Sequence, residues 1–353
     1  NIEEGSFAPA FAYENPETNI GDAYTDPTNN FTVNIICKDF LLMETPNRYD
    51  LVVGNPPFSK LKGKPKDKAK YIDQNINKNT SNLSVMFLEK CIRCSDCVSL
   101  VLNKTILSNH EFDVTRDILG KIKIDTIIDF GRYGFTGVSI ETISLIVYPK
   151  QKPKNTLVYN MKYNNIYEQD QAYITDRKFP YFIIYRDEPF DLVANKLEFN
   201  VFNVFRDRQI TKSITSTKPT PDSLWVVKAR NINDEGAGAT NMDGYDLHIS
   251  EQKAKTLAVY KYVNDTSVYL TPNMTYNPRV MENIKGVIAD GSTAVLIPNQ
   301  PLKLTPEQIS YFSTDEYRAF YKIARNLSTQ SINVDKSSVF FYGKLKNDTQ
   351  LIS

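Results

Sequence analysis

Short apolar runs alternate with amphipathic segments along the first 150 residues of the chain. Apolar residues at helical spacing predict a helix over 81–94, and a shorter helix is expected over 113–122. Runs rich in β-branched residues predict strands at 31–39, 50–55, 97–105, 124–131 and 141–149. Strands that alternate with helices predict an α/β fold with a largely parallel sheet.

Two of these strands carry a more specific expectation. Segment 132–140 has no room for a helix, so the strands on either side of it are expected to pair as an antiparallel hairpin at a sheet edge. The strand at 50–55 is expected to be buried, because Leu51, Val52 and Val53 are apolar and mostly β-branched.

The pattern becomes irregular after residue 150, where a polar connector is followed by long loops and short elements. This half predicts a second domain of mixed α+β structure, with domains at 1–155 and 156–353. Near its end, residues 305–326 have helical periodicity, and Thr305 and Gln308 form a capping-box pattern at its start.

Composition limits the classes of protein that fit. With 353 residues, 41% of them hydrophobic, the chain can bury two cores. A net charge of +1 excludes a polycation, so any nucleic-acid binding must come from local basic patches. The sequence has no signal peptide and no membrane-spanning run, and its four cysteines are too few for a disulfide scaffold. We therefore expect a soluble intracellular protein without a membrane partner.

The stretch "DLVVGNPPF" at 50–58 is the strongest candidate for chemistry. Its strand ends at Gly54, and neither Pro56 nor Pro57 has an N–H for a strand ladder. The carbonyl oxygens of Asn55 and Pro56 can accept two hydrogen bonds in one plane, and Phe58 offers a stacking surface. This arrangement suits a planar exocyclic amino group whose nitrogen faces a methyl donor. The alternative is an ordinary strand-ending turn.

The same stretch resembles motif IV of amino-directed, S-adenosylmethionine-dependent methyltransferases, especially the N6-adenine DNA methyltransferases of type II, IIS and IIG restriction–modification systems. Segments 35–58, 82–109 and 124–150 resemble the family's motifs in gamma order. The resemblance implies a Rossmann-like methyltransferase sheet followed by a C-terminal target-recognition domain. It further implies a catalytic turn made by Asn55, Pro56, Pro57 and Phe58. Phe58 and Phe135 would then stack on an adenine flipped out of duplex DNA.

The cofactor site implied by the resemblance draws on several segments. Asp39 would contact the adenine of S-adenosylmethionine, and Glu14 its ribose. Gly5 and Phe7 match the turn that holds the methionine part, and Asn55 faces the methyl group. The spacing between Gly5 and Glu14 is shorter than a helix and a following strand require.

Double-stranded DNA is the implied partner, together with a separate restriction endonuclease and a bacterial, archaeal or phage source. Lys60, Lys62 and Lys64 belong to a lysine-rich run that fits either a solvated loop or a phosphate-contacting loop. Arg230 and Asn231 are side chains suited to guanine and adenine edges, or polar positions on a partly buried strand.

Other interpretations remain open. Proteins with this tetrapeptide also methylate protein glutamine or RNA amines, and cytosine-N4 enzymes carry a related turn. A DNA-binding specificity protein with a cofactor-deficient methyltransferase fold is the alternative from another class. Cys91, Cys94 and Cys97 have a spacing found in iron–sulfur proteins, but core packing is favoured and no metal is expected.

Overall fold

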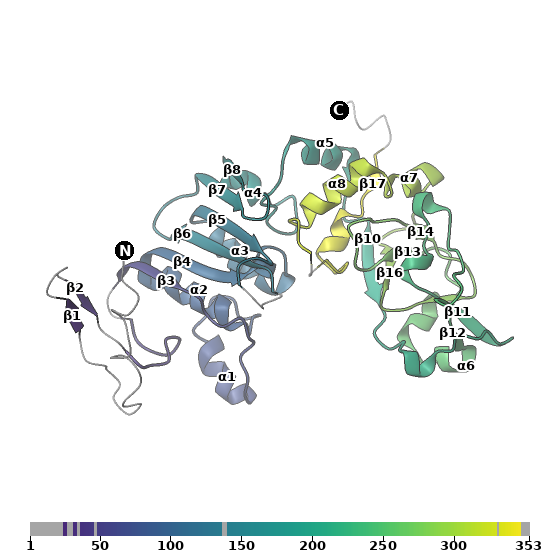
Figure 1. Cartoon of the computed structure of the whole chain (residues 1–353), viewed down its shortest axis with the longest axis horizontal. Helices are drawn as coiled ribbons and strands as arrows, with labels where there is room; N and C mark the ends of the chain where they lie inside the picture. Colours follow the sequence, from purple (N-terminus) through teal and green to yellow (C-terminus); the bar gives the residue numbers. More distant parts are fainter. Residues whose placement is uncertain are drawn as a thin grey trace.

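The computed structural model describes residues 24–26, 31–33, 36–45, 48–135, 140–329 and 332–346. Figure 1 shows strands β3 to β8 in one half of the molecule and strands β10 to β16 in the other, with the two halves side by side. In the described part of the chain, no helix has the length and apolar character needed to cross a membrane.

The first half is built on a six-stranded sheet with the order β3-β4-β6-β5-β7-β8. β3 is parallel to β4, β5 is parallel to β7, and β6 is antiparallel to both β4 and β5. Strands β3, β4, β5 and β7 therefore run in one direction, which confirms the predicted α/β fold with a largely parallel sheet. The strands are β3 (Tyr49–Gly54), β4 (Ser95–Asn103), β5 (Lys123–Gly131), β6 (Thr142–Tyr148), β7 (Asn155–Asn160) and β8 (Asn165–Asp170).

The hairpin predicted between the strands at 124–131 and 141–149 forms, as antiparallel β5 and β6. The prediction that it lies at a sheet edge is wrong. β6 is inserted between β4 and β5, and β7 and β8 extend the sheet beyond β5. Side chains on both faces of β6 are mostly buried, as a central strand requires.

The prediction of a buried strand at 50–55 is also wrong. β3 lies at the edge of the sheet, and 55% of Leu51 and 67% of Val53 are exposed. Among the described residues, β4 is its only strand partner, and its outer edge is not covered. Apolar composition alone predicted burial, but burial depends on the neighbours of a strand.

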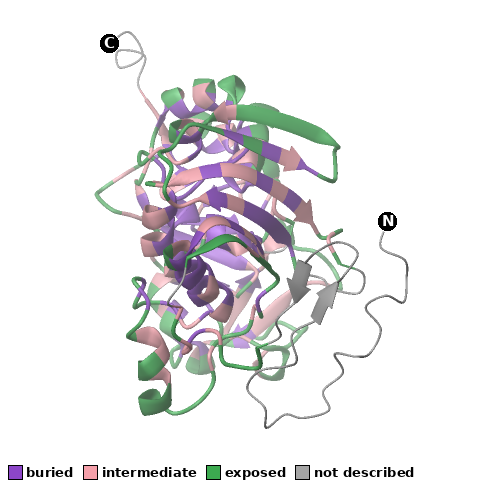
Figure 2. Ribbon diagram, turned by 90° about the vertical axis from the view of Figure 1, so that its left-hand side faces the viewer, coloured by how far each residue is buried: buried purple, intermediate pink, exposed green. Residues whose placement is uncertain are grey.

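Helices pack on this sheet where the sequence predicts them. α2 (Leu83–Cys94) buries Val85, Leu88 and Cys91 against the strands, and α3 (Asp113–Leu119) closes the same core. Figure 2 shows the buried residues concentrated along the middle of the sheet and the helix beside it. An unpredicted helix, α1 (Pro65–Ile72), occupies the lysine-rich run and has no buried residue.

The described N-terminal residues form a separate two-stranded hairpin of β1 (Tyr24–Asp26) and β2 (Phe31–Val33). Of the strand expected over 31–39, the described residues form a strand only at Phe31–Val33. At the other end of the first half, the expected boundary after residue 155 falls at the start of β7, within the six-stranded sheet.

The second half mixes helices with small sheets. One sheet has the order β10-β16-β13-β14, another β12-β11-β15, and β9 pairs with β17. Its strands are β9 (Leu197–Glu198), β10 (Phe202–Arg206), β11 (Ser223–Val227), β12 (Leu247–Ser250), β13 (Tyr269–Pro272), β14 (Met281–Glu282), β15 (Val287–Ala289), β16 (Thr293–Pro298) and β17 (Lys344–Leu345). Its helices, with the short one that follows β8, are α4 (Gln171–Ile174), α5 (Glu188–Lys196), α6 (Glu251–Ala254), α7 (Pro306–Tyr311) and α8 (Asp315–Ala324).

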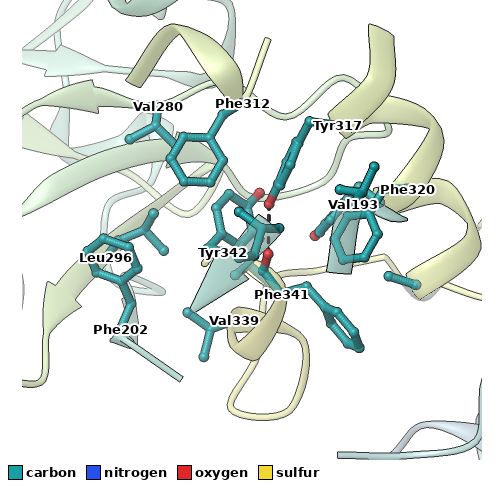
Figure 3. Packing of buried hydrophobic residues seen from close by; sticks show 14 of the residues in the cluster. Val193, Phe202, Val280, Leu296, Phe312, Tyr317, Phe320, Val339, Phe341 and Tyr342 are labelled. Carbon is teal, nitrogen blue, oxygen red and sulfur yellow. Dashed lines mark hydrogen bonds between the residues drawn. The ribbon is translucent and has the colours of Figure 1, made fainter. Parts of the chain in front are cut away.

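Aromatic side chains fill the core between α5, α8 and the four-stranded sheet (Figure 3). Tyr317 is fully buried, and its hydroxyl donates to the carbonyl of Phe341 at 2.9 Å. The helical pattern at 305–326 is divided into α7 and α8, and the capping box of Thr305 and Gln308 is present at the start of α7. This core is distinct from the core beneath the first sheet, and Ile323 packs against both.

Candidate functional site

The carboxyl ends of three parallel strands lie at one edge of the first sheet. The segment Asn55 to Phe58 follows β3, Asn103 ends β4 and is followed by Lys104 and Thr105, and Phe135 follows β5. Since β6 runs the other way, its first residue, Thr142, lies at this edge too. Open α/β sheets bind ligands at this edge, so the sheet brings the predicted catalytic turn and Phe135 to the same side.

The turn after β3 presents its functional groups outward. Pro56 is buried and anchors the turn, while Asn55 and Pro57 are exposed and Phe58 is half-buried. Among the described residues, the Asn55 side chain has no hydrogen-bond partner. Its amide is therefore available for an external ligand, as an amine-binding role requires.

The start of α2 fixes the position of this turn. Asn82 donates from Nδ2 to the Phe58 carbonyl at 3.3 Å, while its Oδ1 caps the helix by accepting from the Ser84 N–H at 3.0 Å. Backbone hydrogen bonds between 59–61 and 81–83 complete the connection. One asparagine thus couples a helix N-terminus to the backbone of Phe58.

Glu111 connects the segment just after the turn to the segment before α2. Its carboxylate accepts from the Thr80 hydroxyl at 2.9 Å and pairs with the Lys60 ammonium at 3.2 Å. Lys60 is therefore part of an exposed ion pair, whereas Lys62 and Lys64 are exposed and make no ion pair with any described residue.

A cavity of about 140 Å³ lies beside the end of β4. The residues around it were not predicted to have a role, although Asn103 ends β4, and Lys104 and Thr105 follow it, at the edge of the sheet that carries the candidate site. The lining combines both halves of the molecule: Asn103, Lys104, Thr105, Ser108, Ile140, Glu141 and Ser328.

A buried ion pair supports the floor of this site. Lys104 and Asp129 are 2.7 Å apart, and their side chains are only 3% and 4% exposed. Tyr185 donates its hydroxyl hydrogen to Asp129 and accepts from Asn160 at 2.8 Å. Burial, and then the Asp129 charge, raise the pKa of Tyr185 far above its ordinary value. The network ties the ends of β4 and β5 together.

Phe135 emerges from a tightly packed bend. It is 37% exposed. A Cβ atom on the preceding Gly134 would lie 2.8 Å from the Thr142 hydroxyl and 2.9 Å from Phe130 Cβ. Glycine is therefore required for this close approach, a role that the sequence alone did not reveal.

Of the predicted cofactor residues, Asp39 is described, and Gly5, Phe7 and Glu14 lie outside the described residues. Asp39 is exposed; its Oδ1 accepts from the Leu41 N–H at 3.0 Å and its Oδ2 from the Tyr71 hydroxyl at 2.7 Å. That hydrogen bond raises the pKa of Tyr71. Each carboxylate oxygen retains a further lone pair for a ligand.

The two residues predicted to read bases are placed differently. Arg230 is exposed, with its guanidinium 5.5 Å from the centre of the Tyr245 ring. Asn231 is fully buried in the 3₁₀ turn Ala229–Asn231, donating to the Thr240 carbonyl at 3.0 Å and to Asp246 at 2.7 Å. Its amide holds the loop that follows β11 and does not face solvent.

The cysteines of α2 and β4 lie in or near the core. Cys91 and Cys94 are buried, and burial raises the pKa of Cys91 to about 12. Cys97 is half-buried on β4. Within the ranges that the structure describes, no group of three or more His, Cys, Asp or Glu side chains is arranged to hold a metal ion.

Residues 9–135 match the family model described as Eco57I restriction-modification methylase. The matched segment contains the turn after β3 and ends at Phe135. The predicted resemblance to restriction–modification methyltransferases is thereby confirmed. No curated protein sequence matches the chain significantly.

Among solved structures, the type IIL restriction-modification enzyme MmeI in complex with DNA has a similar fold. The TM-score is 0.53 at 13% identity, covering 86% of this chain and 48% of that one, so the chain spans about half of that enzyme's length. A nuclease-deletion mutant of the type ISP enzyme LlaGI was solved with a DNA substrate mimic. Its TM-score is 0.47 at 9% identity, covering 83% of this chain and 40% of that one. A type I methyltransferase subunit from Streptococcus thermophilus has a TM-score of 0.29 at 20% identity, covering 34% of this chain and 29% of that one.

Proposed function

We propose that this chain carries the target-base site of a DNA methyltransferase of a restriction–modification system, and that it methylates N6 of an adenine. The observation that carries the proposal is the turn after β3. Its Asn55 amide has no partner among the described residues, and it lies at the ligand-binding edge of the sheet, within the segment that matches the methylase family.

The residues of the turn have distinct roles in this proposal. The amino group of a flipped adenine donates its two hydrogen bonds to Asn55 Oδ1 and the Pro56 carbonyl oxygen, and its ring stacks on Phe58 and Phe135. S-adenosylmethionine, when bound, supplies an electrophilic methyl group. Asn55 and Pro56 would hold the amine nitrogen in line with that methyl group, and the proton displaced from the nitrogen would pass to solvent. Positioning provides most of the rate enhancement.

Part of the implied cofactor site can be tested against the structure. Asp39 is exposed just before β3, and its carboxylate has acceptor capacity beyond the two hydrogen bonds that it makes. It therefore fits a role in holding a cofactor with hydroxyl or amino donors. Together with Asn55, and with Gly5, Phe7 and Glu14 outside the described residues, it forms the proposed binding set for S-adenosylmethionine.

The proposed macromolecular partner is double-stranded DNA. MmeI and LlaGI were solved with DNA or a DNA mimic. In this chain, Lys62, Lys64 and Arg230 are exposed cations suited to phosphate or base contacts. Residues 156–353 are proposed as the target-recognition domain, and a separate restriction endonuclease is the proposed companion protein.

Methyl transfer to DNA tests this function directly. The full chain is incubated with tritiated S-adenosylmethionine and mixed-sequence duplex DNA, with RNA and protein substrates in parallel. We expect label in the adenine fraction of the DNA. Label in cytosine, RNA or protein would instead support the related amine methyltransferases.

The Asn55→Ala substitution tests the role of the turn. We expect at least a hundredfold loss of transfer with DNA affinity retained, because the amide orients the amine but anchors no DNA backbone. Asn264→Ala, at an exposed position in the second half, is the matched control. DNA binding by the unmodified chain without cofactor binding or transfer would favour the cofactor-deficient specificity protein.

A further inference from the structure

A groove of about 350 Å³ lies between the two halves of the molecule, and nothing in the proposed reaction uses it. One wall comes from the segment after β4, and the other from the end of β10 and the approach to the 3₁₀ turn Ser338–Phe341. Its lining residues are Asn109, His110, Val204, Phe205, Arg206, Arg208, Asp335, Lys336 and Ser337.

Among the described residues, three cations and one carboxylate, Asp335, line this groove. Arg206, Arg208 and Lys336 take part in no ion pair among the described residues. Arg206 is half-buried; burial and the neighbouring Arg208 charge lower its pKa, while the Asp335 charge acts in the opposite direction. Two guanidinium groups held near each other repel, so an anion between them would relieve an existing electrostatic cost.

The acidic side chains nearby offset only part of this positive charge, because each makes hydrogen bonds or ion pairs of its own. Asp335 Oδ1 accepts from the backbone N–H groups of Ser337 and Ser338, at 3.0 and 2.8 Å. Asp113 pairs with His110 and Arg116. The groove therefore carries an excess of positive charge in a molecule whose net charge is only +1.

The backbone around Asp207 fixes the two arginines. Asp207 is buried, and its Oδ2 accepts from the N–H groups of Gln209 and Ile210, at 2.8 and 2.7 Å. Arg206 ends β10 opposite Ala294 of β16, which holds it on a rigid strand. A cation on a rigid element loses less conformational freedom on binding than one on a loose loop.

We propose that this groove binds a backbone phosphate of DNA between Arg206 and Arg208, with Lys336 on the same wall and Asn109 and His110 on the opposite wall. The inference rests on the proposed function and adds to it a contact that both halves of the molecule form. Because the groove joins segments near residues 109 and 206, a phosphate held there would fix the duplex relative to the sheet edge that carries Asn55. These contacts position the DNA and carry no sequence information.

The test is the salt dependence of DNA binding by the full chain. Fluorescence anisotropy with a labelled 30-base-pair duplex gives the affinity between about 50 and 300 mM KCl. For Arg206→Ala/Arg208→Ala we expect about tenfold or greater weakening at low salt, and a slope of log affinity against log salt smaller by about one to two. Arg206→Lys/Arg208→Lys should retain the slope, because lysine also binds phosphate as a point charge.

Lys285→Ala, at an exposed position outside the groove, is the matched control and should leave the slope unchanged. If the double alanine variant has the slope of the unmodified chain while DNA binding and methyl transfer persist, this inference fails and the proposed function stands. If the unmodified chain binds no DNA, both fail. If inorganic phosphate binds the unmodified chain and not the double alanine variant, while the duplex has the same affinity and slope with both, the groove binds free phosphate and the inference is overturned.

Discussion

At the scale of single residues, the candidate site depends on side chains that are held by neighbours rather than on the tetrapeptide alone. The Asn55 side chain makes no hydrogen bond to the described residues, whereas Phe58 and Phe135 are placed by Asn82 and Gly134. The tetrapeptide was readable from the sequence because its chemistry is local. Gly134 was not, since its requirement arises from Thr142 and Phe130, which approach it only in the folded sheet.

Replacing Gly134 by alanine tests this dependence. The added Cβ would lie under 3 Å from Thr142 and Phe130, so the bend must shift, and we expect a loss of about 1–3 kcal/mol in the free energy of unfolding. Phe135 should move with the bend and weaken stacking of the target base. Urea unfolding and transfer kinetics measure the two effects.

Gly120→Ala is the matched control, since its Cβ would meet its nearest neighbour at 3.4 Å, an ordinary contact, with no positive φ. We expect it to leave stability unchanged or slightly raised. Equal stability and equal transfer rates for the two variants would contradict the role given to Gly134.

At the scale of elements, local periodicity predicted most helices and strands of the first sheet but not their order. α2, β4 and β5 lie where the apolar pattern indicated. The insertion of β6 between β4 and β5, and the exposure of β3, depend on pairing between distant segments, which a single periodic pattern does not record. For the same reason the sequence did not reveal the groove at Arg206, whose walls come from segments more than 90 residues apart.

The start of α2 is the element on which the catalytic turn depends most. Asn82→Ala removes both the helix cap and the donor to the Phe58 carbonyl. We expect a loss of about 1 kcal/mol in the free energy of unfolding and a further loss of transfer rate, because the turn becomes less ordered. Thermal unfolding and single-turnover transfer kinetics measure these effects.

Asp187→Ala removes an equivalent cap from α5, where the carboxylate accepts from the Phe190 N–H at 2.8 Å. It should lower stability by a similar amount and leave transfer unaffected. The Asn82 prediction would be refuted by a proportionate drop in both variants, since that result would reflect stability alone.

At the scale of the whole molecule, the segment after α8 joins the two cores. Asn326 is 2% exposed; its Oδ1 accepts from the Ile184 N–H at 2.9 Å, and its Nδ2 donates to the Phe182 carbonyl at 2.7 Å. Three residues on, Thr329 donates from its N–H and hydroxyl to Glu141 at the rim of the cavity. The second half is therefore bonded both to the first core and to the candidate site.

This connection predicts that the halves unfold together and that Asn326→Ala separates them. The substitution leaves two buried backbone groups unpaired and places alanine at a φ of 51°. We therefore expect a loss of about 2–5 kcal/mol in the free energy of unfolding. Asn200→Ala is the matched control: Asn200 has a φ of 59° but is exposed, and its side chain makes no hydrogen bond to the described residues. The Asn200→Ala variant measures only the cost of the left-handed backbone conformation, about 1–2 kcal/mol in the free energy of unfolding.

Two probes distinguish the outcomes. Trp225, the single tryptophan, lies on β11 and reports on the second half, while far-ultraviolet circular dichroism reports on the whole chain. In urea, the unfolding transitions followed by Trp225 fluorescence and by circular dichroism should coincide for the unmodified chain and for Asn200→Ala. They should diverge for Asn326→Ala. If they coincide in all three proteins and the two variants are equally destabilised, Asn326 contributes only its backbone conformation. Cooperativity between the halves would then have to come from packing around Ile323, which contacts both cores.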